Sequence, residues 1–273
     1  MVPIVAFSEA ASKKAPDNPA RSRDFVQSLE RGLAVILAFG PDRPELTLTE
    51  VAKTSGLTRA VARRFLLTLV ELGYARSEGR LFSLRPRVME LGYAYLSGLS
   101  LAEVAQTHVE ELVSEIHESS SVCVLDEDEI VYVVRVPTRR IMTMAISVGT
   151  RFPAYCTSMG RVLLADLSDA EIEQYLARVQ FEPLAARTVL QAKDLLVILA
   201  NVRAVGYAIT DQELEDGLRS VAVPIRDSRG RAIASINVSV NSHLVTIEEL
   251  RDEILPKLQS TARSIESDLQ RRG

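Results

Sequence analysis

The sequence predicts an α+β protein of two domains: a small helical domain closed by a β-hairpin, and a larger domain with a mainly antiparallel sheet. The chain has 273 residues, which is enough for two separate hydrophobic cores. Apolar residues recur with helical spacing over much of the first 118 residues and then alternate in short adjacent runs, which is typical of paired strands. The charge also divides the chain, because residues 21–87 carry 12 Lys and Arg against 7 Asp and Glu, and residues 88–273 carry 18 against 27.

A basic first quarter is what a module that binds a polyanion would show, although solvated surface charge alone can also produce such a split. The composition, 47% hydrophobic and 25% charged, is that of an ordinary globular protein, and no apolar run approaches the roughly 20 residues that span a bilayer. Residues 1–22 lack the pattern of a secretory signal and are expected to form a disordered tail on a cytoplasmic protein. Two cysteines and three scattered histidines give neither a disulfide framework nor metal-ligand spacing, so no metal or cofactor is expected.

Three helices are expected in the first domain, at residues 28–39, 48–55 and 58–72. Ser28 is the expected N-cap of the first helix, and Gly56 ends the second. The expected buried stripe of the third helix is Val61, Phe65, Leu69 and Leu72. This stripe leaves Arg59, Ala60 and Arg63 on the opposite face.

Two short strands follow, at residues 74–76 and 81–84, with a turn at Glu78-Gly79. Three helices with a tight glycine turn between the second and the third, closed by a hairpin, are the parts of a winged helix-turn-helix, here over residues 23–85. The arginines of the third helix are therefore candidates for DNA contact. The alternative is that they only solvate an exposed helix face.

The rest of the chain is expected to contain a linker and a second domain. A helix at residues 87–97 and a joint at residues 98–100 mark residues 86–100 as the linker, and residues 101–273 form the domain. Its expected helices are residues 101–118, a helix from residue 158, and residues 168–180 and 191–205, with a closing helix that Thr246 and Glu249 cap. Its expected strands are residues 141–147, 207–210, 218–226 and 232–240, besides a hairpin over residues 121–136 that turns at Glu127-Asp128. Adjacent hairpins favour an antiparallel sheet over a doubly wound parallel one.

Four stretches of the chain resemble the IclR family of bacterial transcription regulators: SLERGLAVILAF, GLTRAVARRFLLTLVELGYA, VGTRFPAYCTSMGRVLLA and VGYAITDQELEDGLRSVAVPI. Two of the forms, AYCTSMGRVLLA and GLRSVAVPI, are similar to the branch that governs protocatechuate, 4-hydroxybenzoate and β-ketoadipate catabolism. The resemblance implies a winged helix-turn-helix that binds operator DNA, and a GAF-like effector-binding and oligomerisation domain. It further implies a small carboxylic-acid effector, and a dimer or tetramer of the chain.

The resemblance places DNA contacts on the third helix and the wing. The family usually carries a Lys-Ser-Thr-like run after the Gly-Leu turn, where this chain has Arg59, Ala60 and Val61, so its arginines are expected to carry more of the recognition. Arg59 and Arg63 are the better candidates for guanine contacts. The wing arginines, Arg76 and Arg80, are expected near phosphates. The candidate DNA-binding residues are Thr58, Arg59, Ala60, Arg63, Arg64, Arg76 and Arg80.

The positions that match the family's effector pocket are Met144, Phe152, Ser158, Met159, Ser220, Asn237 and Ser239. The backbone N–H groups of residues 157–160, ahead of a helix that is expected to begin at Arg161, could hold a carboxylate. Serine and asparagine side chains could bind polar groups, while the methionines and the phenylalanine cover an apolar body. Each residue also has another interpretation: Ser158 as an ordinary N-cap, Met144 as a core residue, and Asn237 and Ser239 as residues that face solvent.

An enzyme is the alternative function, with Cys156 as a nucleophile or the acidic residues 211–216 as general acid and base. No histidine lies near Cys156 in the sequence, the acidic cluster could be a solvated turn, and no GxxxxGKS phosphate loop is present. Arg219, beside this cluster, is at least as well explained by a salt bridge as by carboxylate binding. The sequence therefore predicts a regulator rather than an enzyme, and the size of the second domain disfavours a DNA-binding protein without a ligand.

Overall fold

The computed structural model of the chain describes residues 24–40, 42–96, 100–138 and 146–272. The chain divides into two compact units between residues 95 and 96. Each unit has a hydrophobic core of its own.

The N-terminal unit is a helix-turn-helix with a small sheet. Its helices are α1 (Gln27–Ile36), α2 (Leu48–Thr54) and α3 (Arg59–Glu71), and α4 (Met89–Leu96) follows a 3₁₀ turn at Pro86–Val88. Its strands are β1 (Glu45–Thr47), β2 (Ala75–Glu78) and β3 (Leu81–Leu84), which pair antiparallel in the order β1-β3-β2. The expected helices and the wing hairpin are confirmed, and β1 is an addition that the sequence did not reveal.

Local chemistry explains the turn between α2 and α3. Thr47 and Glu50 form a capping box at the start of α2, and Gly56 adopts φ +67°, a conformation that favours glycine. Thr58 then caps α3, because its side chain accepts a hydrogen bond from the Val61 N–H at 3.4 Å. Ser28 is not a cap as predicted: α1 starts one residue earlier, after Val26, and no side chain caps it.

The buried side of α3 differs in part from the prediction, because Leu69 is buried as predicted but Val61 and Phe65 are only half-buried. Ala62, Leu66 and Leu69 are buried, whereas Leu72 is exposed. Ala62 shares a core cluster with Ala52 of α2, and small residues at a helix contact let the two axes approach closely. The correction leaves the expected arginines on the outer face of the helix.

The C-terminal unit has one six-stranded sheet in the order β6-β5-β4-β9-β8-β7, in which every neighbouring pair is antiparallel. The strands are β4 (Ser119–Asp126), β5 (Glu129–Val136), β6 (Arg151–Pro153), β7 (Ala208–Asp211), β8 (Leu218–Arg226) and β9 (Ala232–Asn241). The helices are α5 (Ser100–Ile116), α6 (Ser158–Asp166), α7 (Asp169–Arg178), α8 (Ala192–Val205), α9 (Ile247–Glu249) and α10 (Leu255–Arg272). The predicted α+β class and antiparallel sheet are confirmed.

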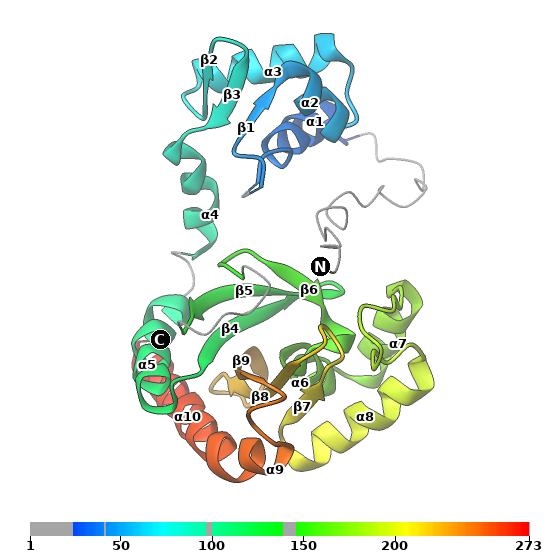
Figure 1. The fold of residues 1–273 in the computed structure, drawn as a ribbon, viewed down its shortest axis with the longest axis vertical. Helices are drawn as coiled ribbons and strands as arrows, with labels where there is room; N and C mark the ends of the chain where they lie inside the picture. The colour runs from blue at the N-terminus through cyan, green and yellow to red at the C-terminus, as the bar shows by residue number, and fades with distance from the viewer. Residues whose placement is uncertain (1–23, 41, 97–99, 139–145, 273) are drawn as a thin grey trace. The chain divides into compact units, whose positions relative to one another are not determined.

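Helices cover both faces of this sheet (Figure 1). α5 and α10 pack on one face, around a core that includes Val122, Ile236 and Val238. α6, α7 and α8 contribute to a second core on the other face, around Tyr132, Met159 and Ala222. In β8 and β9, Val221, Ile236 and Val238 face α5 and α10, so the neighbouring Ser220 and Asn237 face the α6 side.

One predicted strand does not match the structure. Of residues 141–147, only Ile146 and Ser147 are described, and neither is in a strand; the remainder lies outside the described residues. The next strand that the structure describes after the hairpin is β6, which pairs with β5 through Ile130 and Phe152. The hairpin turn at Glu127 is confirmed, with φ +55° at that residue.

Candidate DNA interface and effector site

The outer face of α3 carries unpaired positive charge. Arg59, Arg63 and Arg64 are exposed, and none of them makes an ion pair or a side-chain hydrogen bond with the residues that the structure describes. Ala60 lies exposed among them, and Thr58 precedes them as the N-cap. Free guanidinium groups on one helix are what phosphate or guanine contact requires.

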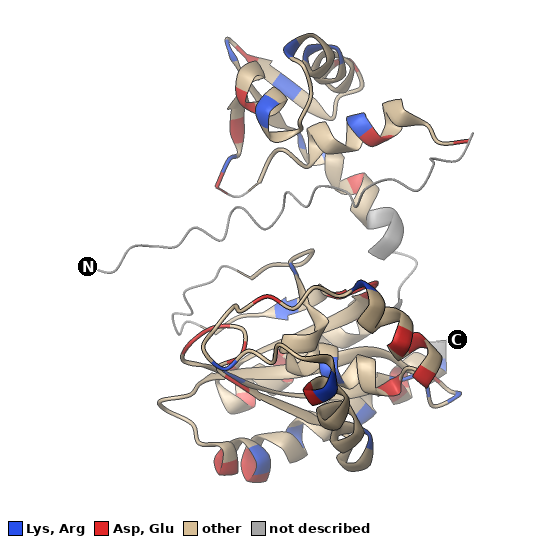
Figure 2. Cartoon of the chain, turned by 90° about the vertical axis from the view of Figure 1, so that its right-hand side faces the viewer, with Lys and Arg blue, Asp and Glu red and all other residues tan. Residues whose placement is uncertain are grey.

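The two wing arginines differ from each other. Arg76 donates from Nε to Ser83 Oγ at 2.9 Å, and its Nη atoms lie 3.8 Å from Glu45 and 3.5 Å from Glu78. Arg80 is exposed at the tip of the hairpin, with no ion pair to a described residue. Figure 2 shows the Lys and Arg positions on the ribbon. Arg80 is therefore the more available cation of the wing.

Four of the predicted effector residues meet in one hydrogen-bonded cluster where α6 begins. Ser158 Oγ lies 2.8 Å from Ser220 Oγ, and Asn237 Nδ2 donates to Ser220 Oγ at 2.9 Å and to Ser239 Oγ at 3.0 Å. All four side chains are buried. The alternative that Asn237 and Ser239 face solvent is wrong, and we name this group the polar cluster.

α6 begins at Ser158, where the sequence predicts that helices resume, and not at Arg161, where the carboxylate hypothesis placed its start. Thr157 is its N-cap. Thr157 Oγ1 accepts from the Gly160 N–H at 3.1 Å, and Thr157 O accepts from the Arg161 N–H at 3.0 Å. Gly160 is required here, because a Cβ at this position would overlap the backbone of Ala154. At least the Gly160 N–H, one of the donors expected to hold a carboxylate, is thus already bonded within the protein.

The apolar candidates have different surroundings. The Phe152 ring packs edge-on against Tyr132, with centroids 5.9 Å apart, and is half-buried. Met159 is fully buried in the core between α6 and the sheet, so it acts as a core residue. Met144 lies outside the described residues.

Arg135 of β5 is a residue of this face that sequence reasoning missed. It pairs in register with Ser121, which pairs with Asn237, so the three side chains form one row across β5, β4 and β9. Arg135 Nη1 donates to Ser121 Oγ at 2.8 Å, and its Nε is buried without a partner. The available signal was an arginine inside the apolar run IVYVVRV.

Two of the acidic residues 211–216, Asp211 and Glu213, form ion pairs with arginines. Glu213 binds the buried Arg161 through both oxygens, with Nη1 at 2.7 Å from Oε1. Asp211 binds Arg219, at 2.8 Å from its Nε, and also Arg187. These contacts are structural, and the salt-bridge interpretation of Arg219 is confirmed.

The geometry also argues against Cys156 as a nucleophile. The side chain is fully buried, and burial raises the pKa of its thiol to about 12. A thiol with this pKa remains protonated at neutral pH, and the thiolate is the reactive form. Within the described residues, no group of three or more His, Cys, Asp or Glu is placed as a metal site would require.

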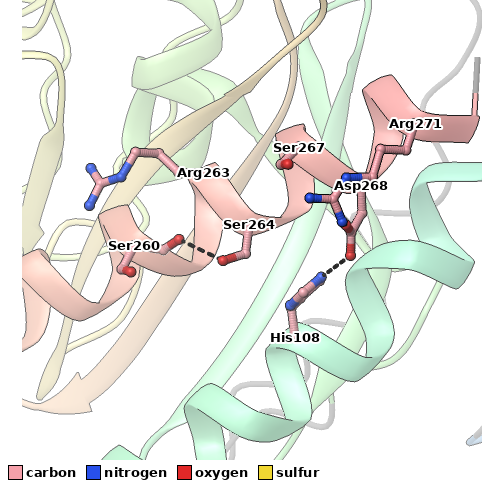
Figure 3. A pocket seen from close by; sticks show the side chains of 7 residues that line it. All are labelled: His108, Ser260, Arg263, Ser264, Ser267, Asp268 and Arg271. Carbon is pink, nitrogen blue, oxygen red and sulfur yellow. Dashed lines mark hydrogen bonds and ion pairs between the residues drawn. The ribbon is translucent and has the colours of Figure 1, made fainter.

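A surface groove of about 430 Å³ lies between α5 and α10 (Figure 3). It is lined by His108, Asp268, Arg263, Arg271 and serines of α10, and His108 Nε2 lies 3.0 Å from Asp268 Oδ2. This lining is polar and contains none of the predicted effector residues. The polar cluster remains the candidate effector site.

Comparison with known proteins identifies the family. The IclR helix-turn-helix domain matches residues 28–79, and the bacterial transcriptional regulator IclR C-terminal domain matches residues 93–267. This chain belongs to the IclR family. None of the helices that the structure describes is both long enough and apolar enough to cross a membrane.

Two curated relatives and one solved structure support this. The chain is 43% identical over 264 residues to the Pca regulon regulatory protein of Pseudomonas putida, covering 96% of this chain and 89% of that protein. It is 35% identical over 251 residues to the p-hydroxybenzoate hydroxylase transcriptional activator of Acinetobacter baylyi, covering 90% and 92%. It also resembles the crystal structure of an IclR homolog complexed with 4-hydroxybenzoate from Microbacterium hydrocarbonoxydans, with TM-score 0.78, 26% identity, and coverage of 89% of this chain and 99% of that one.

The predicted family and function are confirmed by these findings. The chain is an IclR-type transcription regulator with a helix-turn-helix DNA-binding domain and an effector-binding domain. Its similarity to regulators of aromatic-acid catabolism is also confirmed. The alternative of an enzyme has no support, because the relatives are regulators.

Proposed function

We propose that this IclR member binds operator DNA through α3 and the wing, and that a small aromatic acid bound beside the polar cluster changes its operator affinity or the promoter output. In this proposal residues 23–85 bind DNA, residues 86–100 link the domains, and residues 101–273 bind the effector and self-associate in the bacterial cytoplasm. The observation that carries the proposal is the set of buried hydroxyl and amide groups of Ser158, Ser220, Asn237 and Ser239. A buried polar group costs free energy unless it is hydrogen-bonded, and such groups commonly fix the orientation of a ligand.

The relatives support an aromatic acid. One of them activates the expression of p-hydroxybenzoate hydroxylase, and a structural neighbour is complexed with 4-hydroxybenzoate. In this chain the rings of Tyr132 and Phe152 lie on the α6 side of the sheet, where they could contact an aromatic ring. Benzoic acids that carry a ring hydroxyl are the class that we expect to bind.

The DNA contacts are assigned to Thr58, Arg59, Ala60, Arg63 and Arg64 on α3, with Arg76 and Arg80 at phosphates. Arg59 and Arg63 are proposed to contact bases, because they are exposed, unpaired and one helical turn apart. Arg76 is proposed to contribute less than Arg80, since Glu45 and Glu78 partly neutralise it.

Substitution of Arg59 or Arg63 by Ala tests the DNA interface. Each substitution is expected to weaken binding to a duplex selected with the wild-type chain by about 10- to 100-fold, in line with about 1–3 kcal/mol for a bidentate base contact. Fluorescence anisotropy at fixed salt measures the affinity. Arg231→Ala is the matched control, because Arg231 is exposed, is paired with Asp227 and lies in the C-terminal unit. Equal affinities for all four proteins would contradict the assignment to α3.

Self-association is proposed through α1. Leu29 and Leu33 of α1 are exposed, and together with the exposed cap residues Val26 and Leu37 they form a stripe along the helix. An apolar stripe in water is costly to leave uncovered, and a second copy of the same helix would cover it. We therefore propose a dimer that presents two recognition helices to two half-sites, with a tetramer as a further possibility through the effector domains.

Transmission of the effector signal is assigned to α5. This is the first helix of the C-terminal unit, and it packs on β4, β5 and α10. An acid that binds one arrangement of this unit better than another shifts the population of both arrangements. Through α5 such a shift would alter how two recognition helices meet the half-sites.

A further inference from the structure

The surface groove between α5 and α10, with a volume of about 430 Å³, is built from different residues than the polar cluster (Figure 3). α5 contributes His108 to its lining, and α10 contributes the rest. The α10 residues recur at helical spacing and so share one face of that helix: Ser260, Arg263, Ser264, Ser267, Asp268 and Arg271. Every side chain that lines the groove is polar or charged, so the groove suits a hydrophilic ligand.

Positive charge gathers in this groove although the surrounding sequence is acidic. Residues 88–273 carry 18 Lys and Arg against 27 Asp and Glu, whereas the lining holds two arginines and a histidine against one aspartate. Both oxygens of that aspartate are engaged, because Asp268 Oδ2 lies 3.0 Å from His108 Nε2 and Oδ1 accepts from Arg271 Nη1 at 3.2 Å. Glu111 of α5 lies 4.0 Å from His108 Nδ1, but it is exposed and is not part of the lining.

Arg263 is the cation that this arrangement leaves available. Its side chain is exposed, and it forms no ion pair or hydrogen bond with the residues that the structure describes. Arg271 binds Asp268 through Nη1 but is 77% exposed, so further donors of its guanidinium face solvent. The groove therefore holds more donor hydrogens and more positive charge than its own carboxylate uses.

Ser267 lies midway between the two arginines along α10. Residues four apart in an α-helix lie one above the other with a rise of about 6 Å, so Arg263 and Arg271 flank the Ser267 hydroxyl from the turns on either side. Figure 3 shows Arg263 extended away from Arg271. Exposed side chains change rotamer within nanoseconds, and no contact with a described residue holds Arg263 in that orientation, so both guanidiniums can converge over Ser267.

This set of donors fits a phosphate group better than a carboxylate. A carboxylate has two oxygens and a single charge, which one guanidinium satisfies in a bidentate pair. A phosphate monoester has three acceptor oxygens and a charge of about −1.5 to −2 at neutral pH. Two guanidiniums and a hydroxyl match both its charge and its number of oxygens.

We propose that the groove between α5 and α10 is a second ligand site, which binds the phosphate group of a small molecule. Arg263 and Arg271 bind the phosphate oxygens, and the Ser267 hydroxyl donates a hydrogen bond to them. This site is additional to the polar cluster and does not depend on the function proposed for that cluster. Because His108 joins α5 to Asp268 beside Arg271, a bound phosphate lies next to the contact between the two helices.

Isothermal titration of the full chain at constant ionic strength tests the site, with pyrophosphate as the probe and malonate, its dicarboxylate counterpart, as the control. Pyrophosphate is expected to bind saturably and at least about tenfold more tightly than malonate. Arg263→Gln is expected to weaken pyrophosphate binding at least about tenfold, and Arg263→Lys, which keeps the charge but loses the planar fork, is expected to weaken it less. Arg251→Gln is the matched control, because Arg251 is exposed, precedes α10 and lies outside the lining.

Thermal melting without ligand checks that the variants fold, which is expected because the substituted side chains are exposed. Three results would each overturn the inference: no saturable binding of pyrophosphate to the wild-type chain at millimolar concentration, equal affinity for malonate, or equal affinities in the Arg263→Gln and Arg251→Gln variants. Sedimentation equilibrium of the same variants is measured in parallel. A lower association constant in Arg263→Gln, with unchanged pyrophosphate affinity, would show instead that the groove is a contact between copies of the chain.

Discussion

At the scale of single residues, a buried ion pair between Arg161 and Glu213 stabilises the effector domain. Arg161 is among the largest fully buried side chains, and its Nε also donates to the Tyr155 carbonyl at 2.9 Å. Glu213, 12% exposed, is its counter-ion and ties the loop after β7 to α6. This pair positions α6, whose first residue, Ser158, belongs to the polar cluster.

Glu213→Gln is expected to destabilise the protein by about 3 kcal/mol, because it leaves a buried guanidinium without a carboxylate. Urea denaturation followed by circular dichroism measures this loss. Glu115→Gln is the matched control, since Glu115 pairs with Lys257 at 2.9 Å but both side chains are about half exposed. The control is expected to cost less than about 1 kcal/mol. Equal losses in the two variants would show that the Arg161 pair has no special structural role.

At the scale of elements, α1 is amphipathic with an uncovered side. Val35 and Ala38 reach the core of the N-terminal unit, while Leu37 is 78% exposed. A helix of ten residues gains most of its stability from packing, so the exposed leucine stripe along α1 is consistent with the proposed self-association.

The double substitution Leu29→Glu and Leu37→Glu is expected to weaken self-association at least about tenfold, because four charges would enter the interface of a dimer. Sedimentation equilibrium at micromolar concentration measures the association constant. Leu244→Glu serves as the control, as Leu244 is 64% exposed and lies in the C-terminal unit. An unchanged association constant in the α1 variant would exclude α1 as the contact.

Elements with local signals could be predicted from the sequence, and those that depend on distant pairing could not. Thr246 with Glu249 and Gly56 with its turn are recognisable within a few residues, and the structure confirms both. β1 is only three residues long and exists because β3, far along the chain, pairs with it.

The candidate effector site shows the same limit. Ser158, Ser220, Asn237 and Ser239 came from the family resemblance, and the structure brings them together. Sequence reasoning missed Arg135 because the pairing register of β4 with β5 shifts between Val122 and Cys123. The alternation of side chains between the two faces of the sheet is therefore interrupted in β5. The side of the sheet on which Arg135 lies could not be counted from the strand pattern alone.

At the scale of the whole molecule, one unit carries the arginines that we propose to contact DNA, and the other carries the polar cluster. Regulation therefore requires a coupling free energy between two separate sites. Coupling of 1–3 kcal/mol corresponds to about a 5- to 150-fold change in affinity, and it acts equally in both directions.

The most direct measurement is the affinity of the full chain for its selected operator duplex, by fluorescence anisotropy, with and without saturating 4-hydroxybenzoate, protocatechuate or β-ketoadipate. One hydroxylated aromatic acid is expected to change operator affinity at least about fivefold, and operator DNA is expected to change the affinity for that acid by the same factor. Promoter output is measured in parallel, because an acid can alter the bound geometry at constant affinity. If none of these acids changes operator affinity, the geometry of the bound complex or promoter output, control by an acid at the polar cluster is contradicted.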